Sequence, residues 1–216
     1  MIAATDSAPD PIENLNRLLA KAGLRAISES QEAQFSAYLG LILRWNARMN
    51  LTAVRTPSDI QSRHFVESIA CAQFLPQGIG SLLDFGSGAG FPGIPIAICR
   101  PEIAVTLAES QSKKAAFLQE AGRTLGLGSH VFAHRAEELT ESFDCVTLRA
   151  VDHMQKAIES ASKLIEPGGY LAVLTTASEI SAARSAAGEN LEWLDPIALP
   201  ASDQRVLATA KRCSGA

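Results

Sequence analysis

The fold is decided by the stretch Ser81-Leu82-Leu83-Asp84-Phe85-Gly86-Ser87-Gly88-Ala89-Gly90-Phe91-Pro92-Gly93. Its first residues form a short, mostly apolar run, which suits a strand buried on both faces of a parallel sheet. The glycines that follow allow positive φ and a close approach of the backbone to a ligand. They stand at the carboxyl end of the strand, where open α/β sheets bind their ligands.

Further apolar runs after this stretch predict six more strands. We expect these strands at Ile103–Ala108, His130–Ala133, Phe143–Leu148, Tyr170–Thr175, Leu191–Leu199 and Arg205–Lys211. Helical patterns separate most of them, at Gly93–Arg100, Ser112–Leu125, Asp152–Ile165 and Ser178–Ala187. Alternating strands and helices imply right-handed crossovers, and therefore an α/β fold with a doubly wound, mostly parallel seven-stranded sheet. The final hairpin adds one antiparallel strand.

The first third of the chain has helical spacing instead. Apolar residues recur every three to four positions in residues 12–22, in Ser30–Met49 and from Thr56 to just before Pro76. With 216 residues, the chain can bury one sizeable core but not two full enzyme domains. We therefore expect an N-terminal helical extension, residues 1–76, followed by a Rossmann-like domain, residues 77–216.

Composition excludes several classes of protein. The chain is 47% hydrophobic and 19% charged, which excludes intrinsic disorder. No run approaches the roughly 20 apolar residues of a membrane span, and the start lacks the pattern of a secretory signal. The four cysteines are widely spaced and the four histidines show no ligand spacing, so neither a disulfide frame nor a metal site is expected. These features predict a soluble, cytoplasmic protein.

The net charge of −4 argues against a nucleic-acid partner, because such domains are usually basic. The charge is unevenly distributed, however. Residues 35–75 contain four arginines and two acidic residues, a net charge of +2. The negative charge of the chain is thus not concentrated in residues 35–75, and this segment could still face a nucleic acid.

The glycine-rich loop fits two cofactors. Gly86-x-Gly88-x-Gly90 resembles the loop that holds S-adenosylmethionine in Rossmann-type methyltransferases, whereas Gly88-x-Gly90-x-x-Gly93 matches the pattern of NAD-dependent oxidoreductases. A plain structural turn is a third possibility. Pro92 removes one of the N–H groups that a pyrophosphate requires at a helix N-terminus, while S-adenosylmethionine has no phosphate. The loop alone leaves the choice open.

Two turns further along carry polar groups suited to an adenosine. Glu109 follows the second strand, where a carboxylate can accept hydrogen bonds from both ribose hydroxyls. After the third strand, a backbone N–H of Ala136 or Glu137 can bond an adenine ring nitrogen. A helix followed by Pro-Gly-Gly (residues 167–169) and a strand is frequent in adenosylmethionine enzymes, which favours methyl transfer.

The fourth strand ends in Thr147-Leu148-Arg149-Ala150, which contains no recognisable catalytic base or nucleophile. There is no Asn-Pro-Pro-aromatic motif, Pro-Cys nucleophile or Ser/His/Asp set. A substrate atom with its own lone pair needs no base and requires only in-line placement. A purine ring nitrogen meets that condition.

The chain resembles the bacterial 16S ribosomal RNA guanine-N7 methyltransferases, the glucose-inhibited division protein B family. The motifs that carry the resemblance are Trp45-Asn46-Ala47-Arg48-Met49-Asn50-Leu51-Thr52-Ala53, Arg63-His64-Phe65-Val66-Glu67-Ser68 and Gly90-Phe91-Pro92-Gly93-Ile94-Pro95. It extends from about Phe35 to Leu174. The resemblance implies methylation of one guanine N7 in small-subunit ribosomal RNA, with S-adenosylmethionine as cofactor and no metal.

The loop and the resemblance together give the candidate site residues. The cofactor candidates are Gly86, Ser87, Gly88, Gly90, Phe91, Glu109, Ala136, Glu137 and Arg149. The candidates for RNA contact are Asn46, Asn50, Arg63 and His64. No residue is a certain catalytic group, and Arg149 and His64 are candidates for positioning.

Several alternatives stay open at this point. Trp45, Asn46 and Asn50 also fit a purely structural role, in packing and in fixing the turn after a helix. Glu67 and Glu109 replace the family's usual aspartates, and Thr175-Thr176 replaces its usual Lys-Gly pair. A small-molecule methyltransferase remains possible beside the NAD enzyme. For the RNA enzyme we expect a monomer that binds a structured ribonucleoprotein weakly and in a salt-sensitive manner.

Overall fold

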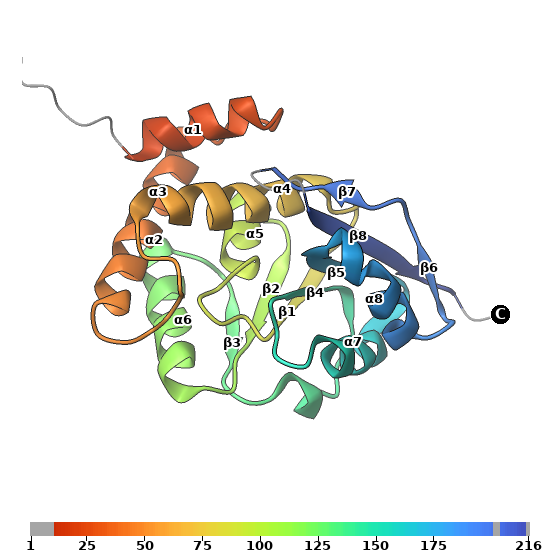
Figure 1. Cartoon of the computed structure of the whole chain (residues 1–216). Coiled ribbons are helices and arrows are strands. Elements are labelled where there is room, and N and C mark those ends of the chain that lie inside the picture. Colours follow the sequence, from red (N-terminus) through yellow and green to blue (C-terminus); the bar gives the residue numbers. More distant parts are fainter. Residues whose placement is uncertain (1–10, 201–203, 215–216) are drawn as a thin grey trace, which may run out of the picture.

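The computed structural model describes residues 11–200 and 204–214, and a twisted sheet with helices on both faces forms its centre (Figure 1). The strands are β1 Ser81–Phe85, β2 Ala104–Ala108, β3 His130–Phe132, β4 Phe143–Arg149, β5 Ile165–Thr176, β6 Leu191–Trp193, β7 Ile197–Ala198 and β8 Arg205–Arg212. Their order is β3-β2-β1-β4-β5-β8-β6, with β7 paired to β8. Strands β1 to β5 are parallel, and β8 runs antiparallel to its neighbours. The predicted doubly wound, mostly parallel α/β fold is confirmed.

Within residues 11–200 and 204–214, the sheet has eight strands rather than the predicted seven. The segment expected as one strand, Leu191–Leu199, is divided into β6 and β7. Trp193 pairs with Ala210 and Ile197 with Leu207, so three residues separate the two pairs on the side of β6 and β7, and two residues separate them on β8. Pro196 lies in this irregular part, where a residue without an N–H interrupts the ladder.

Helices cover the two faces of the sheet. They are α1 Pro11–Lys21, α2 Glu29–Asn46, α3 Pro57–Asp59, η1 Ile60–Phe65, α4 Val66–Phe74, α5 Gly93–Cys99, α6 Ser112–Leu125, η2 Ala136–Glu138, α7 Met154–Lys163, η3 Ala177–Glu179 and α8 Ile180–Ala187. One hydrophobic core joins α1, α2, α4, α5 and α6 to one face of the sheet. A second joins α7 and α8 to the other face. Side chains alternate between the two, as in Leu82 and Leu83 of β1.

The helix predicted from Thr56 to before Pro76 contains an irregular segment. Thr56 caps α3 by accepting the Asp59 N–H, and η1 then has π-helical hydrogen bonds before α4 begins at Val66. Single π-helical turns inside helices are frequently found at functional sites. Arg63 and His64 lie in this segment.

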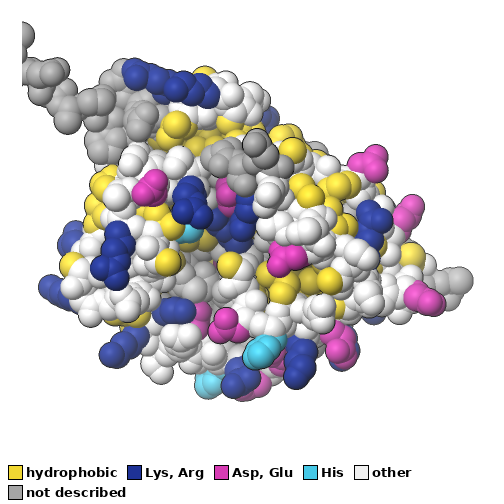
Figure 2. Space-filling view, in the orientation of Figure 1, with side chains coloured by type: hydrophobic (Ala, Val, Ile, Leu, Met, Phe, Trp, Pro, Cys, Tyr) yellow, Lys and Arg dark blue, Asp and Glu magenta, His cyan; other side chains and the backbone are white. Residues whose placement is uncertain are grey.

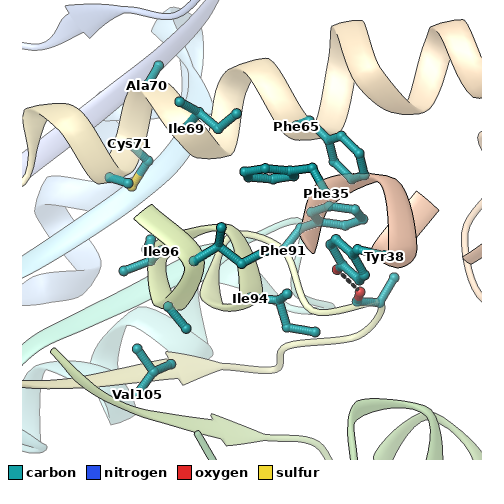
Figure 3. Packing of buried hydrophobic residues seen from close by; sticks show 14 of the residues in the cluster. Phe35, Tyr38, Phe65, Ile69, Ala70, Cys71, Phe91, Ile94, Ile96 and Val105 are labelled. Atoms are coloured by element: carbon teal, nitrogen blue, oxygen red, sulfur yellow. Dashed lines mark hydrogen bonds between the residues drawn. The ribbon is translucent and has the colours of Figure 1, made fainter. Parts of the chain in front are cut away.

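The N-terminal helices pack directly on the glycine-rich loop (Figure 3). Phe35 and Tyr38 of α2 meet Phe65 of η1 at ring-centroid distances of 5.1 and 5.4 Å, and Tyr38 lies 5.5 Å from Phe91. The buried Tyr38 hydroxyl also donates a hydrogen bond of 2.5 Å to the carbonyl of Ala89. One continuous core therefore crosses residue 76, and a boundary between 1–76 and 77–216 stays a prediction.

Within the part of the chain described, no helix is both long enough and apolar enough to cross a membrane.

Candidate active site

A cavity of about 800 Å³ lies at the carboxyl edge of the sheet. Five segments and one isolated side chain form most of its lining: Phe85–Ala89, Ala108–Gln111, His134–Glu137, Arg149–His153, Leu51–Ala53 and His64. Most of the predicted site residues lie here. Gly90, Asn46, Asn50 and Arg63 do not belong to the lining.

The glycine-rich loop follows β1 and takes its shape from left-handed residues. Gly86, Gly88 and Gly90 have φ of 73°, 56° and 89°. A Cβ atom on Gly90 would lie 2.5 Å from the Cδ1 atom of Ile94 and 2.8 Å from the Tyr38 hydroxyl. Gly90 is therefore required for the packing of the loop, while Gly86 and Gly88 present their backbone to the cavity.

The start of α5 is occupied by a carboxylate of the protein itself. Asp84 accepts the Gly93 N–H at 3.1 Å and the Thr147 hydroxyl at 3.0 Å. Burial raises the pKa of Asp84 to about 6, although both hydrogen bonds favour the carboxylate. Because Asp84 uses the Gly93 N–H and brings negative charge, a pyrophosphate has no place there. This arrangement argues against the NAD pattern.

Glu109 faces the loop from the end of β2. Its two carboxylate oxygens accept the Gly88 N–H at 3.0 Å and the Gln111 N–H at 2.7 Å. The carboxylate is buried and its position is fixed by the backbone. Each oxygen keeps a second lone pair, so the group can still accept two hydroxyl hydrogen bonds.

The turn after β3 forms the adjoining part of the lining. Ala136 is buried at the start of η2, and no side chain caps this short helix. Glu137 is exposed beside it and also lines the cavity. A contact of these two residues with the adenine stays a prediction.

Arg149 ends β4 and connects the sheet to the N-terminal helices. Its Nη2 atom donates to Glu67 at 2.8 Å and to the Arg63 carbonyl at 2.8 Å, and lies 3.0 Å from Nδ1 of His64. The side chains of Arg149 and Glu67 are only 8% and 5% exposed. Arg205 of β8 lies 3.3 Å from the same Glu67 oxygen. One buried carboxylate thus serves two guanidinium groups, which leaves a net charge of +1 among these three residues.

His64 lies between this ion pair and the cavity. Its ring centroid is 4.7 Å from that of Phe91, and its Nε2 atom is 3.0 Å from the Thr52 hydroxyl. Burial and the nearby charge of Arg149 lower the pKa of His64 to about 3. The imidazole is therefore neutral at pH 7, and both of its nitrogens are engaged.

The remaining candidates for RNA contact lie outside the lining. Asn46 donates to the Val54 carbonyl and accepts the Thr52 N–H, so its amide holds the loop after α2. Asn50 is exposed and accepts a hydrogen bond from Arg55 at 3.1 Å. The exposed side chain of Arg63 belongs to η1. A contact of these residues with RNA stays a prediction.

Other residues at the site were not selected from the sequence. Thr52 lines the cavity, and its place in the motif with Trp45 was an available signal. Glu67 was noted only as a departure from the family pattern. Ala150 and His153 have positive φ, 50° and 53°, and such backbone strain clusters at ligand sites. Arg205 gives no local signal, because its partner lies 138 residues away.

Comparison with known proteins identifies the family. The family model described as rRNA small subunit methyltransferase G matches residues 31–191. The chain belongs to this family. A curated relative named ribosomal RNA small subunit methyltransferase G, from Xanthomonas axonopodis pv. citri, is 44% identical over 171 residues, 76% of each protein. One of the same name from Stenotrophomonas maltophilia is 46% identical over 137 residues, 62% of this chain and 64% of that protein.

Solved structures agree on the fold. A predicted O-methyltransferase from Agrobacterium tumefaciens has a TM-score of 0.59 at 20% identity, covering 68% of this chain and 80% of that one. A SAM-dependent methyltransferase from Aquifex aeolicus has a TM-score of 0.57 at 16% identity, covering 73% and 94%. The predicted membership of a small-subunit methyltransferase G family and the predicted Rossmann-type methyltransferase fold are both confirmed.

No group of three or more His, Cys, Asp or Glu side chains is arranged to hold a metal ion within residues 11–200 and 204–214. The Thr175-Thr176 pair is engaged locally, since both hydroxyls donate to Glu179, the last residue of η3. This edge therefore carries a helix cap where the family was expected to carry a lysine.

Proposed function

We propose that this methyltransferase transfers a methyl group from S-adenosylmethionine to N7 of a guanine in small-subunit ribosomal RNA. The observation that carries the proposal is the joint lining of one cavity. The glycine-rich loop and Glu109 form one side, and Thr52 and His64 of the family's N-terminal motifs form the other. The family membership of the chain supports the same substrate.

The residues present fit S-adenosylmethionine. Glu109 has two lone pairs available for ribose hydroxyls, and the backbone of Gly86 and Gly88 is exposed to the cavity without side chains. The uncapped turn at Ala136 and Glu137 is suited to the adenine. When bound, the cofactor supplies a methyl group activated by its positively charged sulfur.

The protein's contribution to the reaction is placement of the base. Guanine N7 attacks with its own lone pair, so no residue has to remove a proton, and the neutral, fully engaged His64 is not suited to that role. Catalysis then depends on holding N7 and the methyl carbon in line at about 3 Å. Arg149 and His64 position the wall against which the base lies. A cation that stabilised the product is not required, because the methylated guanine is itself cationic.

The partner we propose is a structured ribonucleoprotein in the cytoplasm, bound by a monomer of this chain. Lys114, Arg135 and Lys156 line the cavity and can reach phosphates around it. Figure 2 shows Lys and Arg side chains beneath α3 and along the edge near α6, on a protein whose net charge is −4. Binding of RNA is therefore expected to be modest and to weaken steeply with salt.

The test is transfer of labelled methyl from S-adenosylmethionine to small-subunit particles purified from cells that lack this protein. We expect the label at N7 of one guanine, and no transfer when that guanine is replaced by 7-deazaguanine. A label on another ring atom, or on a small molecule only, would contradict the proposal. Calorimetry that found binding of NAD and none of S-adenosylmethionine would contradict it as well.

A further inference from the structure

The Thr52 hydroxyl lies at the junction of the N-terminal motif and the cavity. Thr52 belongs to the loop between α2 and α3 and lines the cavity together with His64 and Arg149. Its Oγ1 atom accepts the Val54 N–H at 3.2 Å and lies 3.0 Å from Nε2 of His64. The direction of the second hydrogen bond decides what the hydroxyl can offer to a ligand.

The neighbouring arginine sets that direction. Nδ1 of His64 is 3.0 Å from Nη2 of Arg149, and a guanidinium carries donors only. A protonated Nδ1 would face this guanidinium donor to donor, so Nδ1 is the unprotonated nitrogen and shares one of the two Nη2 hydrogens with the other acceptors of Nη2, the Glu67 carboxylate and the Arg63 carbonyl. In a neutral imidazole the proton then resides on Nε2, which donates to the Thr52 hydroxyl oxygen. The ion pair of Arg149 with Glu67 holds this arrangement in place.

The Thr52 oxygen thus accepts two hydrogen bonds, one from Val54 and one from His64. These use both of its lone pairs, and only its own proton remains to be shared. No residue in the described ranges, 11–200 and 204–214, accepts that proton. Towards a ligand in the cavity, the hydroxyl is consequently a donor and cannot act as an acceptor.

We propose that the Thr52 hydroxyl selects guanine by donating a hydrogen bond to O6 of the target base. This inference rests on the proposed function. Guanine presents O6 and N7 as adjacent acceptors, whereas adenine presents an amino group beside N7. A hydroxyl that can only donate pairs with O6 and leaves the N7 lone pair available for the methyl group. The same hydroxyl would face the adenine amino group donor to donor, which excludes that base.

The first experiment changes the base and leaves the protein intact. The guanine that receives the label is replaced by 2-aminopurine, which keeps N7 and lacks O6, in reconstituted small-subunit particles. We expect kcat/KM of the wild-type enzyme to fall by about 10- to 100-fold, the effect of leaving one buried donor unpaired. Equal rates on the two particles would overturn the inference.

The second experiment changes the protein. Thr52→Val removes the hydroxyl, and Thr52→Ser is the matched control that keeps a donor at the same position. On guanine particles we expect the valine variant to lose about 10- to 100-fold in kcat/KM and the serine variant to stay within a few fold of wild type. On 2-aminopurine particles the valine variant should equal the wild type, because the contact is already absent. An equal loss on both particles would show a merely structural role and overturn the inference.

Two measurements separate this inference from the proposed function. Wild-type enzyme that methylates neither particle contradicts the proposed function itself. If the wild-type enzyme methylates guanine particles and the Thr52→Val variant has an unchanged kcat/KM, only the proposed hydrogen bond from Thr52 to O6 is contradicted. Calorimetry with S-adenosylmethionine should give the same affinity for the valine variant and the wild type, since Thr52 lies on the base side of the cavity.

Discussion

The two walls of the cavity are built in different ways. The sheet wall consists of the ends of β1, β2 and β3 and presents mostly backbone, with Glu109 held by neighbouring N–H groups. The helical wall is lined by Leu51–Ala53, His64 and Arg149. It is held from behind by side chains from distant parts of the chain, which do not line the cavity themselves. Arg149 and Glu67 are 82 residues apart, and Arg205 joins the same carboxylate from β8. The sheet wall therefore serves mainly to bind the ligand, whereas the helical wall both binds the ligand and stabilises the fold.

The difference predicts different consequences of mutation. On the helical wall, the loss of one partner leaves a buried charge without compensation, which lowers the free energy of unfolding. On the sheet wall, the loss of a side chain changes ligand affinity and leaves most of the packing intact. Each of the following experiments tests one side of this contrast.

Substitution of Glu67 should have the largest effect. Glu67→Leu leaves the guanidinium of Arg149 buried and unpaired and removes the partner of Arg205, so the free energy of unfolding should fall by about 3–5 kcal/mol. Urea denaturation measures this change. Glu159→Gln is the control, because Glu159 pairs with Lys163 on an exposed helix surface and should change stability by less than about 0.5 kcal/mol. A loss below about 1 kcal/mol for Glu67→Leu would remove the contrast between the walls.

The buried carboxylate of Asp84 predicts a dependence of stability on pH. Burial raises its pKa from 3.8 to about 6, so in the unfolded chain the group ionises at lower pH than in the folded protein. Ionisation of Asp84 therefore lowers the free energy of unfolding progressively as pH rises from 3.8 to about 6, and this loss stays constant above that range. The shift corresponds to about 3 kcal/mol.

Asp84→Asn removes this titration while one amide oxygen can still accept the Gly93 N–H. We expect the difference in unfolding free energy between the variant and the wild type to change in favour of the variant between pH 4 and pH 6.5. Parallel stability curves for the two proteins over that range would show that Asp84 titrates normally.

The glycine at position 90 tests the packing that supports the sheet wall from behind. Gly90→Ala places a methyl group against Ile94 and the Tyr38 hydroxyl in a backbone with φ of 89°, which should cost about 2 kcal/mol. Thermal unfolding measures the loss. Gly40→Ala, in α2 with no atom near its added methyl group, should instead be neutral or stabilising by up to about 1 kcal/mol. Equal effects of the two substitutions would contradict the packing described for the loop.

Substitution of Glu109 should have the smallest effect on the fold and a clear effect on binding. Glu109→Gln loses one acceptor oxygen and the negative charge, and we expect affinity for S-adenosylmethionine to fall about tenfold, or ~1.4 kcal/mol. Calorimetry measures this, with Glu109→Asp as the control that keeps a carboxylate. An affinity unchanged by Glu109→Gln would place the ribose elsewhere.

The same contrast explains which features the sequence could predict. The strands β1 to β4, the glycine-rich loop and Glu109 follow from local patterns, because parallel strands bring their carboxyl ends to one edge. The cofactor candidates on the sheet wall required no knowledge of distant contacts. Gly90 illustrates the limit, since a glycine needed for a ligand and one needed for packing look alike in sequence.

The helical wall depends on contacts that no local pattern records. The π-helical hydrogen bonds of η1 do not alter the apolar spacing, so the segment was expected to be ordinary helix. The pairing of Glu67 with Arg149 and Arg205 requires the register of three separate elements. The division at Pro196 of the strand expected at Leu191–Leu199 could have been anticipated, because proline cannot donate to a ladder.

The hydrogen bond from Tyr38 to Ala89 has a consequence for recombining this protein with its relatives. A helix of the extension supports the main chain of the loop that is expected to hold the cofactor, and three aromatic rings surround that contact. A chimera that exchanges residues 1–76 for those of a distant relative would bring a foreign surface against the loop. The grafted segment and residues 89–94 would then have to be taken from the same relative, although they are separate in the sequence.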